Sequence, residues 1–284
     1  MEYTILNGRM INRPSALVDI EDRGYQFGDG VYEVIRVYNG KMFAAKEHME
    51  RFVKSSDSIG IKLPYTLEHI TNMLKDLIER NSLRLGIIYM QITRGTAPRN
   101  HAFPTHDVTP CLTAYTSEYP IPKTNLTAGV KTILTEDIRW LRCDIKSLNL
   151  LGNVLAKQKA EENDCYEAIQ HRGEEVTEGS SSNVFIVKNG TVVTHESNHL
   201  ILKGITKEVI LRVCIENNIH AEERTFSIDE LKEADEVFLS STTSEVTPIV
   251  VIDGKNVGDG KPGPVTKKIQ DLFRKEIEKQ CGKL

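Results

Sequence analysis

The chain has 284 residues, of which 39% are hydrophobic and 27% charged, and its formal net charge is −4. This length suits about two ordinary domains, and the apolar content is sufficient for real cores. The small negative charge gives no electrostatic case for nucleic acid or an acidic membrane as a partner, and no apolar run approaches the length of a membrane span.

Two Asn-Gly pairs mark hairpins in the first part of the chain. The strand-like segment Tyr3–Leu6 leads into Asn7-Gly8, and Val31–Tyr38 leads into Asn39-Gly40. Both residue types accept the positive φ angles that a two-residue hairpin turn requires. Each pair therefore predicts two antiparallel strands joined by a tight turn.

Two amphipathic helices are predicted next, over residues 46–58 and 67–80, because apolar residues recur on one helical face in each segment. Strands are expected over 85–93 and 111–116. The segment between them, 94–110, is rich in Pro, Gly, His and Arg. Since most connections are shorter, this segment is predicted to be a functional loop.

The composition changes at residues 118–127, where prolines predict a linker and divide the chain into domains 1–120 and 121–284. Strand-like and helix-like segments alternate beyond it. In chain order we expect a strand at 130–134, a helix at 150–163, a strand at 167–170, a hairpin of 184–187 with 192–194 through Asn189-Gly190, a helix at 206–216, strands at 236–239 and 248–252, and a helix at 264–280.

The five cysteines are scattered, odd in number and contain no C-x-x-C pair. This pattern favours free thiols in a reducing cytoplasm over a disulfide framework or a zinc site, and no metal is expected. The first residues have neither a basic nor an apolar region of the kind found in secretory signals, so no such signal is expected.

A lysine stands out in the segment Arg142–Ser147, where Lys146 precedes an apolar helix. A lysine must lose its proton to act as a nucleophile, which requires burial or a cationic neighbour. The local sequence alone favours a solvated lysine at a strand end over a catalytic lysine at position 146.

Three further segments concentrate hydroxyl or backbone N–H groups. Glu178–Asn183 is a carboxylate followed by Gly and three serines, Leu202–Thr206 directly precedes a helix, and Ser240–Ser244 follows an apolar strand. The last two could bind an anion at a helix N-terminus and in a backbone nest, although an ordinary polar turn, a helix cap and a Ser/Thr loop are the commoner structures. With the lysine they suit a phosphate-bearing cofactor, and the sequence has no G-x-S-x-G, Walker, H-E-x-x-H or G-x-G-x-x-G motif.

Five strings, in order along nearly the whole chain, resemble those of the fold-type-IV enzymes that use pyridoxal 5′-phosphate (PLP), the class IV aminotransferase family, and above all its members that act on D-amino acids. The strings are EDRGYQFGDGVYE (Glu21–Glu33), IRWLRCDIKSLNLL (Ile138–Leu151), EGSSSN (Glu178–Asn183), ILKGIT (Ile201–Thr206) and STTSEVTP (Ser241–Pro248). The resemblance implies an α+β fold of two domains: a smaller N-terminal α/β domain and a larger C-terminal cofactor-binding domain with a β-barrel-like core, with the active site between them.

The resemblance also implies roles for single residues. Lys146 matches the lysine that carries PLP as a Schiff base, and Glu178 matches the acid that faces the pyridine nitrogen. Other positions match the phosphate-binding groups, the residue that packs against the ring, and the cofactor loop. These are Arg51, Ile205, Thr206 and Thr242 for the phosphate, Leu202 for the ring, and Ser181 and Ser182 for the loop.

Substrate recognition is implied by the R-x-H pattern of Arg99 and His101, which with Tyr32 resembles the trap for the substrate α-carboxylate. Arginine suits this role because its planar fork meets a carboxylate with two hydrogen bonds. In the family this loop reaches the neighbouring subunit's active site, so a homodimer is implied. The implied reaction converts D-alanine and 2-oxoglutarate to pyruvate and D-glutamate.

Two other activities of the same fold are alternatives, a branched-chain L-amino acid aminotransferase and an aminodeoxychorismate lyase. The R-x-H pattern and the EGSSSN loop favour the D-specific interpretation. A non-catalytic binding protein of this fold is disfavoured, because every residue expected for the chemistry is present.

Overall fold

The computed structural model describes residues 2–105 and 107–284, so His106 of the predicted loop lies outside the described residues. The chain forms two compact units. Unit 1 contains Met1–Pro120, Ile145–Asn149 and Ile277–Leu284, and unit 2 contains Ile121–Asp144 and Leu150–Glu276. Two segments beyond residue 120 thus belong to unit 1, and one of them carries Lys146.

Unit 1 is built on a six-stranded antiparallel sheet of order β2-β1-β6-β5-β3-β4. The Asn-Gly predictions are confirmed, because Asn7, Gly8, Asn39 and Gly40 have φ angles of 49°, 75°, 51° and 74° at the two hairpin turns. The strands are β1 (Tyr3–Leu6), β2 (Arg9–Asn12), β3 (Gly30–Tyr38), β4 (Lys41–Met42), β5 (Leu85–Thr93) and β6 (Cys111–Glu118).

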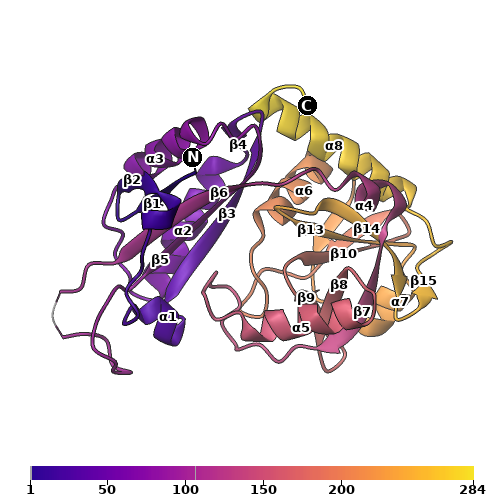
Figure 1. Ribbon diagram of the computed structural model, residues 1–284. Helices are drawn as coiled ribbons and strands as arrows, with labels where there is room; N and C mark the ends of the chain where they lie inside the picture. The colour runs from indigo at the N-terminus through magenta and orange to yellow at the C-terminus, as the bar shows by residue number, and fades with distance from the viewer. Residues whose placement is uncertain (1, 106) are drawn as a thin grey trace. The chain divides into compact units, whose positions relative to one another are not determined.

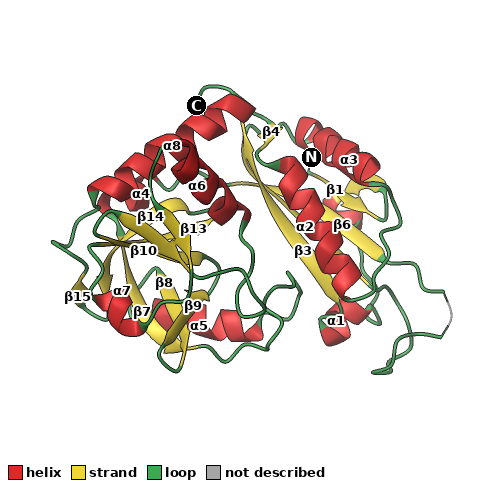
Figure 2. Cartoon of the chain, turned by 180° about the vertical axis from the view of Figure 1, so that it is seen from behind, coloured by secondary structure: helices red, strands yellow, loops and turns green. Residues whose placement is uncertain are grey.

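Two long helices cover one face of this sheet, as Figure 2 shows. They are α2 (Ala45–Ser58) and α3 (Leu67–Arg80), and both agree with the helices predicted from hydrophobic periodicity. Phe52 of α2 and Leu74 of α3 are buried with Val31 and Ile35 of β3, and burial of side chains of this size stabilises by about 1.5–3 kcal/mol each. The same unit contains the short helices η1 (Arg13–Ser15) and α1 (Arg23–Phe27).

Unit 2 is built on a nine-stranded mixed sheet of order β12-β11-β10-β13-β14-β7-β8-β9, with β15 paired to β14. The sheet curls, since β9 approaches β10 and Gly179 N–H donates to the Ser182 carbonyl at 2.7 Å. This half-barrel is the barrel-like core that was expected. The strands are β7 (Val130–Glu136), β8 (Glu167–Arg172), β9 (Glu175–Gly179), β10 (Asn183–Lys188), β11 (Thr191–Thr194), β12 (Ala221–Glu223), β13 (Glu236–Ser241), β14 (Glu245–Ile252) and β15 (Lys255–Asn256).

Helices connect and cover the strands of unit 2. The helix α5 (Leu151–Glu162) joins the parallel strands β7 and β8, which require such a crossover, and it lies beside them in Figure 1. The remaining helices are α4 (Lys123–Ala128), α6 (Ile205–Glu216), α7 (Ile228–Lys232) and α8 (Pro264–Cys281). None of the described helices is long and apolar enough to span a membrane.

The predicted linker at 118–127 is only partly irregular. The strand β6 extends to Glu118, and α4 begins at Lys123 directly after Pro122. Proline is compatible with a helix start because its missing N–H would have no intrahelical acceptor there. The side chain of Leu126 is buried, which anchors this short helix to unit 2.

Candidate functional site

The backbone around Lys146 is held by β3 and α2 within unit 1. Tyr32 N–H donates to the Lys146 carbonyl at 3.0 Å, and Lys146 N–H donates to Ser55 Oγ at 3.2 Å. The half-buried Lys146 side chain places Nζ 4.2 Å from the centre of the Tyr32 ring. The lysine is therefore fixed against an aromatic face and is not the solvated residue that its local sequence favours.

A buried carboxylate lies beside this segment and was missed by the sequence analysis. Glu33 of β3 has no exposed side-chain surface and accepts hydrogen bonds from Arg51 Nε at 2.9 Å, Arg51 Nη2 at 2.6 Å and His48 Nδ1 at 3.0 Å. Burial alone raises the pKa of Glu33, but Arg51 and His48 outweigh it and hold the pKa well below the ordinary range. Arg51, on α2, is thus oriented by Glu33 through two hydrogen bonds.

The R-x-H loop of unit 1 packs on Phe27 of α1. The Cζ atom of Arg99 lies 4.8 Å from the centre of the Phe27 ring, and the His101 ring lies 5.4 Å from it. Both Arg99 and His101 are exposed. The described contacts of Tyr32 are instead with Lys146 and with Tyr89, whose ring stacks on it at 5.7 Å. The structure thus brings Arg99 and His101 together on Phe27, whereas Tyr32 contacts Lys146.

Two other arginines near this loop have fixed partners. Asp29 accepts from Arg23 Nε at 2.8 Å and from Arg94 Nε and Nη2 at 2.8 and 3.0 Å. Arg23 also donates to the carbonyl of Asn100, at 2.6 Å, in the loop itself. These ion pairs anchor the base of the loop, while Arg99 is presented at its surface.

In unit 2 the Glu178 carboxylate at the end of β9 is surrounded by donors. It accepts from Arg139 Nη1 at 2.5 Å, Asn183 Nδ2 at 3.0 Å and Leu202 N–H at 3.1 Å. A protonated carboxyl would need an acceptor for its own O–H, so these contacts fit the ionised form. Burial nevertheless raises the pKa of Glu178 above its ordinary value, because the loss of hydration outweighs the opposing effect of Arg139.

The three serines after Glu178 are organised by a second buried carboxylate, Glu167 of β8. Ser180 Oγ donates to Glu167, as do Ser181 Oγ at 3.2 Å and Ser182 Oγ at 3.0 Å. The hydroxyl protons of Ser181 and Ser182 are thus directed at Glu167, and the place of both residues in the cofactor loop stays a prediction. The loop backbone is used as well, because Ser180 N–H and Ser181 N–H donate to Glu167 and the Ser182 carbonyl accepts from Gly179 N–H. The lone pairs of the hydroxyl oxygens can still accept hydrogen bonds.

The N-terminus of α6 presents backbone N–H groups without a side-chain cap. Gly204 is the N-cap residue, and Ile205 and Thr206 form the first turn. Thr206 is thus inside the helix, and the cap position belongs to Gly204. A Cβ atom on Gly204 would lie 2.0 Å from Asn183 Oδ1, which explains glycine at this position. The first turn of such a helix is a favourable place for an anion.

The remaining predicted positions have structural surroundings of their own. The Leu202 carbonyl accepts from Asn183 Nδ2 at 3.0 Å, so both backbone groups of Leu202 are used around Glu178. Thr242 is half-buried in the turn between β13 and β14. That turn is closed by Ser244 N–H, which donates to Ser241 Oγ at 3.0 Å.

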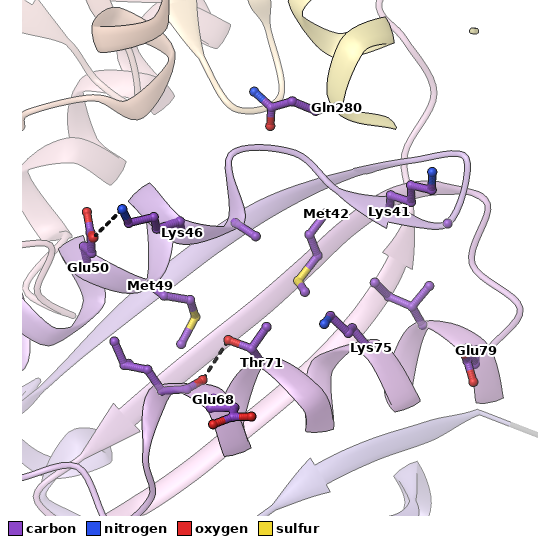
Figure 3. A pocket seen from close by; sticks show the side chains of 14 residues that line it. Lys41, Met42, Lys46, Met49, Glu50, Glu68, Thr71, Lys75, Glu79 and Gln280 are labelled. Carbon is purple, nitrogen blue, oxygen red and sulfur yellow. Dashed lines mark hydrogen bonds and ion pairs between the residues drawn. The ribbon is translucent and has the colours of Figure 1, made fainter. Parts of the chain in front are cut away.

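Unit 1 has a cavity of about 760 Å³, and none of the predicted site residues lines it. Met42 and Met49 form part of its apolar lining, and Lys46 at its edge pairs with Glu50 at 3.8 Å, as Figure 3 shows. Its charged residues alternate in sign, with Lys41, Lys46 and Lys75 against Glu50, Glu68 and Glu79. None of its lining residues is a nucleophile or acid singled out above, so volume does not identify the chemical site.

Residues 30–252 match the family model of amino-transferase class IV, so the chain belongs to that family. A D-alanine aminotransferase of Staphylococcus aureus (strain MSSA476) is 52% identical over 98% of this chain and 99% of its own length. Those of Staphylococcus haemolyticus and Listeria monocytogenes serotype 1/2a are 51% and 50% identical, each over 99% of this chain and over 100% and 98% of their own lengths.

Solved structures give the same fold at lower identity. The branched-chain amino acid aminotransferase of Escherichia coli has a TM-score of 0.91 and 27% identity, over 96% of this chain and 93% of its own. A second branched-chain amino acid aminotransferase, solved with pyridoxamine 5′-phosphate, has a TM-score of 0.92 at 24% identity, over 99% of this chain and 94% of its own.

Proposed function

Because the chain belongs to the class IV aminotransferase family, we propose that it is a PLP-dependent enzyme that transfers the amino group of D-alanine and related D-amino acids to 2-oxo acids. The observation that carries this proposal is the 50–52% identity to D-alanine aminotransferases over at least 98% of the chain. With 2-oxoglutarate as acceptor, the products are pyruvate and D-glutamate.

The residues of the chain fit PLP in charge and hydrogen bonding. Lys146 offers an amine fixed against an aromatic ring, and Glu178 offers a carboxylate whose present partners are all donors. The uncapped first turn of α6, at Ile205 and Thr206, suits the phosphate. Arg51 and the turn at Thr242 are proposed to contribute to phosphate binding, and Leu202 to pack against the ring.

When bound, PLP supplies an aldehyde that condenses with amino groups and a ring that accepts electrons from the substrate Cα. The Lys146 amine is proposed to take the proton from the substrate Cα and to return it at the carbon that belonged to the PLP aldehyde, acting as base and then as acid. Glu178 holds a proton at the pyridine nitrogen, which strengthens electron withdrawal. Each half of the exchange uses the same residues, so ping-pong kinetics are expected.

Arg99, His101 and Tyr32 are proposed to bind the substrate α-carboxylate. Arg99 is exposed, and its contact with Phe27 leaves its fork able to meet a carboxylate. Fixing the carboxylate on one side determines which enantiomer presents its Cα–H to the base. D-specificity is therefore assigned to this trap.

A homodimer is proposed from exposed apolar side chains around α1 and the R-x-H loop. Leu17, Ile20 and Tyr25, which are close together in the sequence, are 79%, 78% and 80% exposed, and Phe103 of the R-x-H loop is 60% exposed. Such exposure is unusual for large apolar residues and is typical of an interaction surface. A second copy that covers them would bring the exposed loop to a neighbouring subunit. A cytoplasmic location is also proposed, since all five cysteines are free.

A branched-chain L-amino acid aminotransferase is the second candidate, because the two solved structures described above are branched-chain amino acid aminotransferases. Their identity to this chain is 24–27%, about half that of the D-alanine aminotransferases. The same assay with D-alanine, L-leucine and 4-amino-4-deoxychorismate separates the three activities of the fold.

The deciding experiment combines absorbance with chemical trapping. The PLP band of the purified protein should change with D-alanine and not with L-alanine, and borohydride followed by peptide mapping should modify Lys146. Lys146→Ala should lose the band and nearly all turnover, whereas Lys131→Ala, an exposed lysine on β7, should keep both. Modification of a different lysine, or an unchanged band with D-alanine, would contradict the proposal.

A further inference from the structure

Arg139 lies between two buried carboxylates of unit 2. Its Nη1 donates to Glu178 Oε1 at 2.5 Å, while Nε and Nη2 donate to the two oxygens of Asp137 at 2.9 and 2.8 Å. The side chain of Arg139 is 5% exposed, and those of Asp137 and Glu178 are 0% and 6% exposed. One guanidinium therefore serves two acids that water barely reaches.

Asp137 is the fixed end of this arrangement. Besides Arg139, it accepts from Arg172 Nε at 3.1 Å and from Thr177 Oγ1 at 3.0 Å. Burial acts to raise its pKa, but the arginines prevail and lower it to about 2. An ionised, fully bonded Asp137 allows the guanidinium fork only one orientation, and in that orientation Nη1 points at Glu178.

The charged surroundings of Glu178 contain one cation in direct contact. Among the described residues, the charged groups with the largest effect on the Glu178 pKa are Arg139 and Asp137, and Cys143 and Arg172 belong to the same cluster. Burial raises the pKa of Cys143 to about 11, so the thiol is uncharged near neutral pH. Burial and Asp137 both favour a protonated Glu178, and Arg139 is the charge that opposes them.

We propose that Arg139 is a positioning residue for the transamination proposed above: held by Asp137, it keeps the Glu178 carboxyl ionised and aimed. The inference rests on that proposed function. Arg139 acts through Glu178 and is not assigned any contact with PLP. An anionic Glu178 can stabilise a protonated pyridine nitrogen, whereas a neutral acid would leave the ring a weaker electron acceptor.

The charge of Glu178 can be measured in the cofactor-free protein. Labelling with [δ-¹³C]glutamate permits an infrared titration of the protonated carboxyl band, and Glu178→Gln identifies the signal. In Arg139→Gln the midpoint should rise by about one to three pH units, the usual effect of removing an opposite charge at this distance. Arg139→Lys should restore part of this shift, because it keeps the charge without the fork.

Arg142→Gln is the matched control. Arg142 lies three residues away, is half-exposed and pairs with Asp144 at 3.0 Å. It should leave the Glu178 midpoint unchanged. If Arg139→Gln does not fold, the comparison of Arg139→Lys with Arg142→Lys tests the same claim, since only the former should raise the midpoint.

The loaded enzyme gives a second measurement. In Arg139→Gln, kcat with D-alanine should fall about tenfold for each pH unit by which the Glu178 midpoint exceeds the pH of the assay. The change in KM should be smaller. A Glu178 midpoint equal to that of the wild type in Arg139→Gln would overturn the inference. If instead the wild type fails to transaminate D-alanine, the proposed function fails, while the titration of the cofactor-free protein still decides the role of Arg139.

Discussion

Both units contain a buried glutamate paired with an arginine, and the two pairs have opposite organisation. In unit 1, Glu33 has two basic partners, Arg51 and His48, and its pKa is lowered. In unit 2, Glu178 shares Arg139 with a second acid, and its pKa is raised. The first carboxylate serves to hold an arginine in place, whereas in the second pair the arginine serves the carboxylate. The balance of neighbouring charges decides which partner is available for chemistry.

The largest effect is expected from Glu33→Gln, which tests the role of the carboxylate in unit 1. It leaves Arg51 and His48 without their buried anion, and breaking a buried pair costs about 3–5 kcal/mol. Urea denaturation should show this loss, and PLP affinity should fall because Arg51 is no longer oriented. Glu50→Gln, which removes a partner from the exposed pair with Lys46, should leave the unfolding midpoint unchanged. Equal stability of Glu33→Gln and wild type would show that Glu33 does not hold Arg51.

Gly204→Ala tests how tightly the surroundings of Glu178 are packed. The added methyl group would meet Asn183 Oδ1 at 2.0 Å, and Asn183 could not retain its bonds to Glu178 and Leu202. A loss of about 1–3 kcal/mol is expected from overpacking, together with weaker PLP binding. In the Asn183→Ala background the same substitution should cost much less. Additive costs in this double-mutant cycle would rule out the steric cause.

Thr177→Val tests how much the hydrogen bond from Thr177 stabilises the Asp137 carboxylate in unit 2. Thr177 Oγ1 donates to Asp137 Oδ2 at 3.0 Å, and valine has the same shape without the hydroxyl. Loss of a hydrogen bond to a buried charge is expected to cost about 1.5–3 kcal/mol, measured by denaturant unfolding. Thr127→Val, which removes an exposed hydroxyl on α4, should have little effect. A Thr177→Val protein as stable as Thr127→Val would mean that Asp137 does not depend on this bond.

The smallest expected effect is on the pH dependence of stability, which should differ between Glu33 and Glu178. The lowered pKa of Glu33 contributes stability above the ordinary value of 4.5, and this contribution is lost as the pH falls toward the folded-state pKa. The raised pKa of Glu178 has the opposite sign, since stability is lost as the pH rises above 4.5 toward the folded-state pKa. Unfolding of Glu33→Gln and Glu178→Gln across acidic pH should show stability differences from wild type that change in opposite directions. A change in the same direction would contradict the contrast.

Most elements of both units could be predicted from local sequence. The helix at Leu67–Arg80 and the Asn-Gly hairpins were predicted correctly because one periodicity or one dipeptide specifies each. The strands β9 and β12 and the helix α7 are among the elements that were missed. They are short and polar, and pairing with neighbouring strands holds β9 and β12 in place. The capping box of Ser227 and Glu230 was a signal that could have revealed α7.

The sequence by itself determined the family, the order of the elements and the candidate residues Lys146 and Glu178, because these depend on motifs and periodicities read along the chain. Only the tertiary structure decided which groups orient them. Glu33, Arg139, Glu167 and Asp137 each contact a partner 13 to 40 residues away in the sequence, and the same residue types are mostly exposed elsewhere. A charge acquires its role from burial and from the charges beside it, and both exist only after the strands have paired.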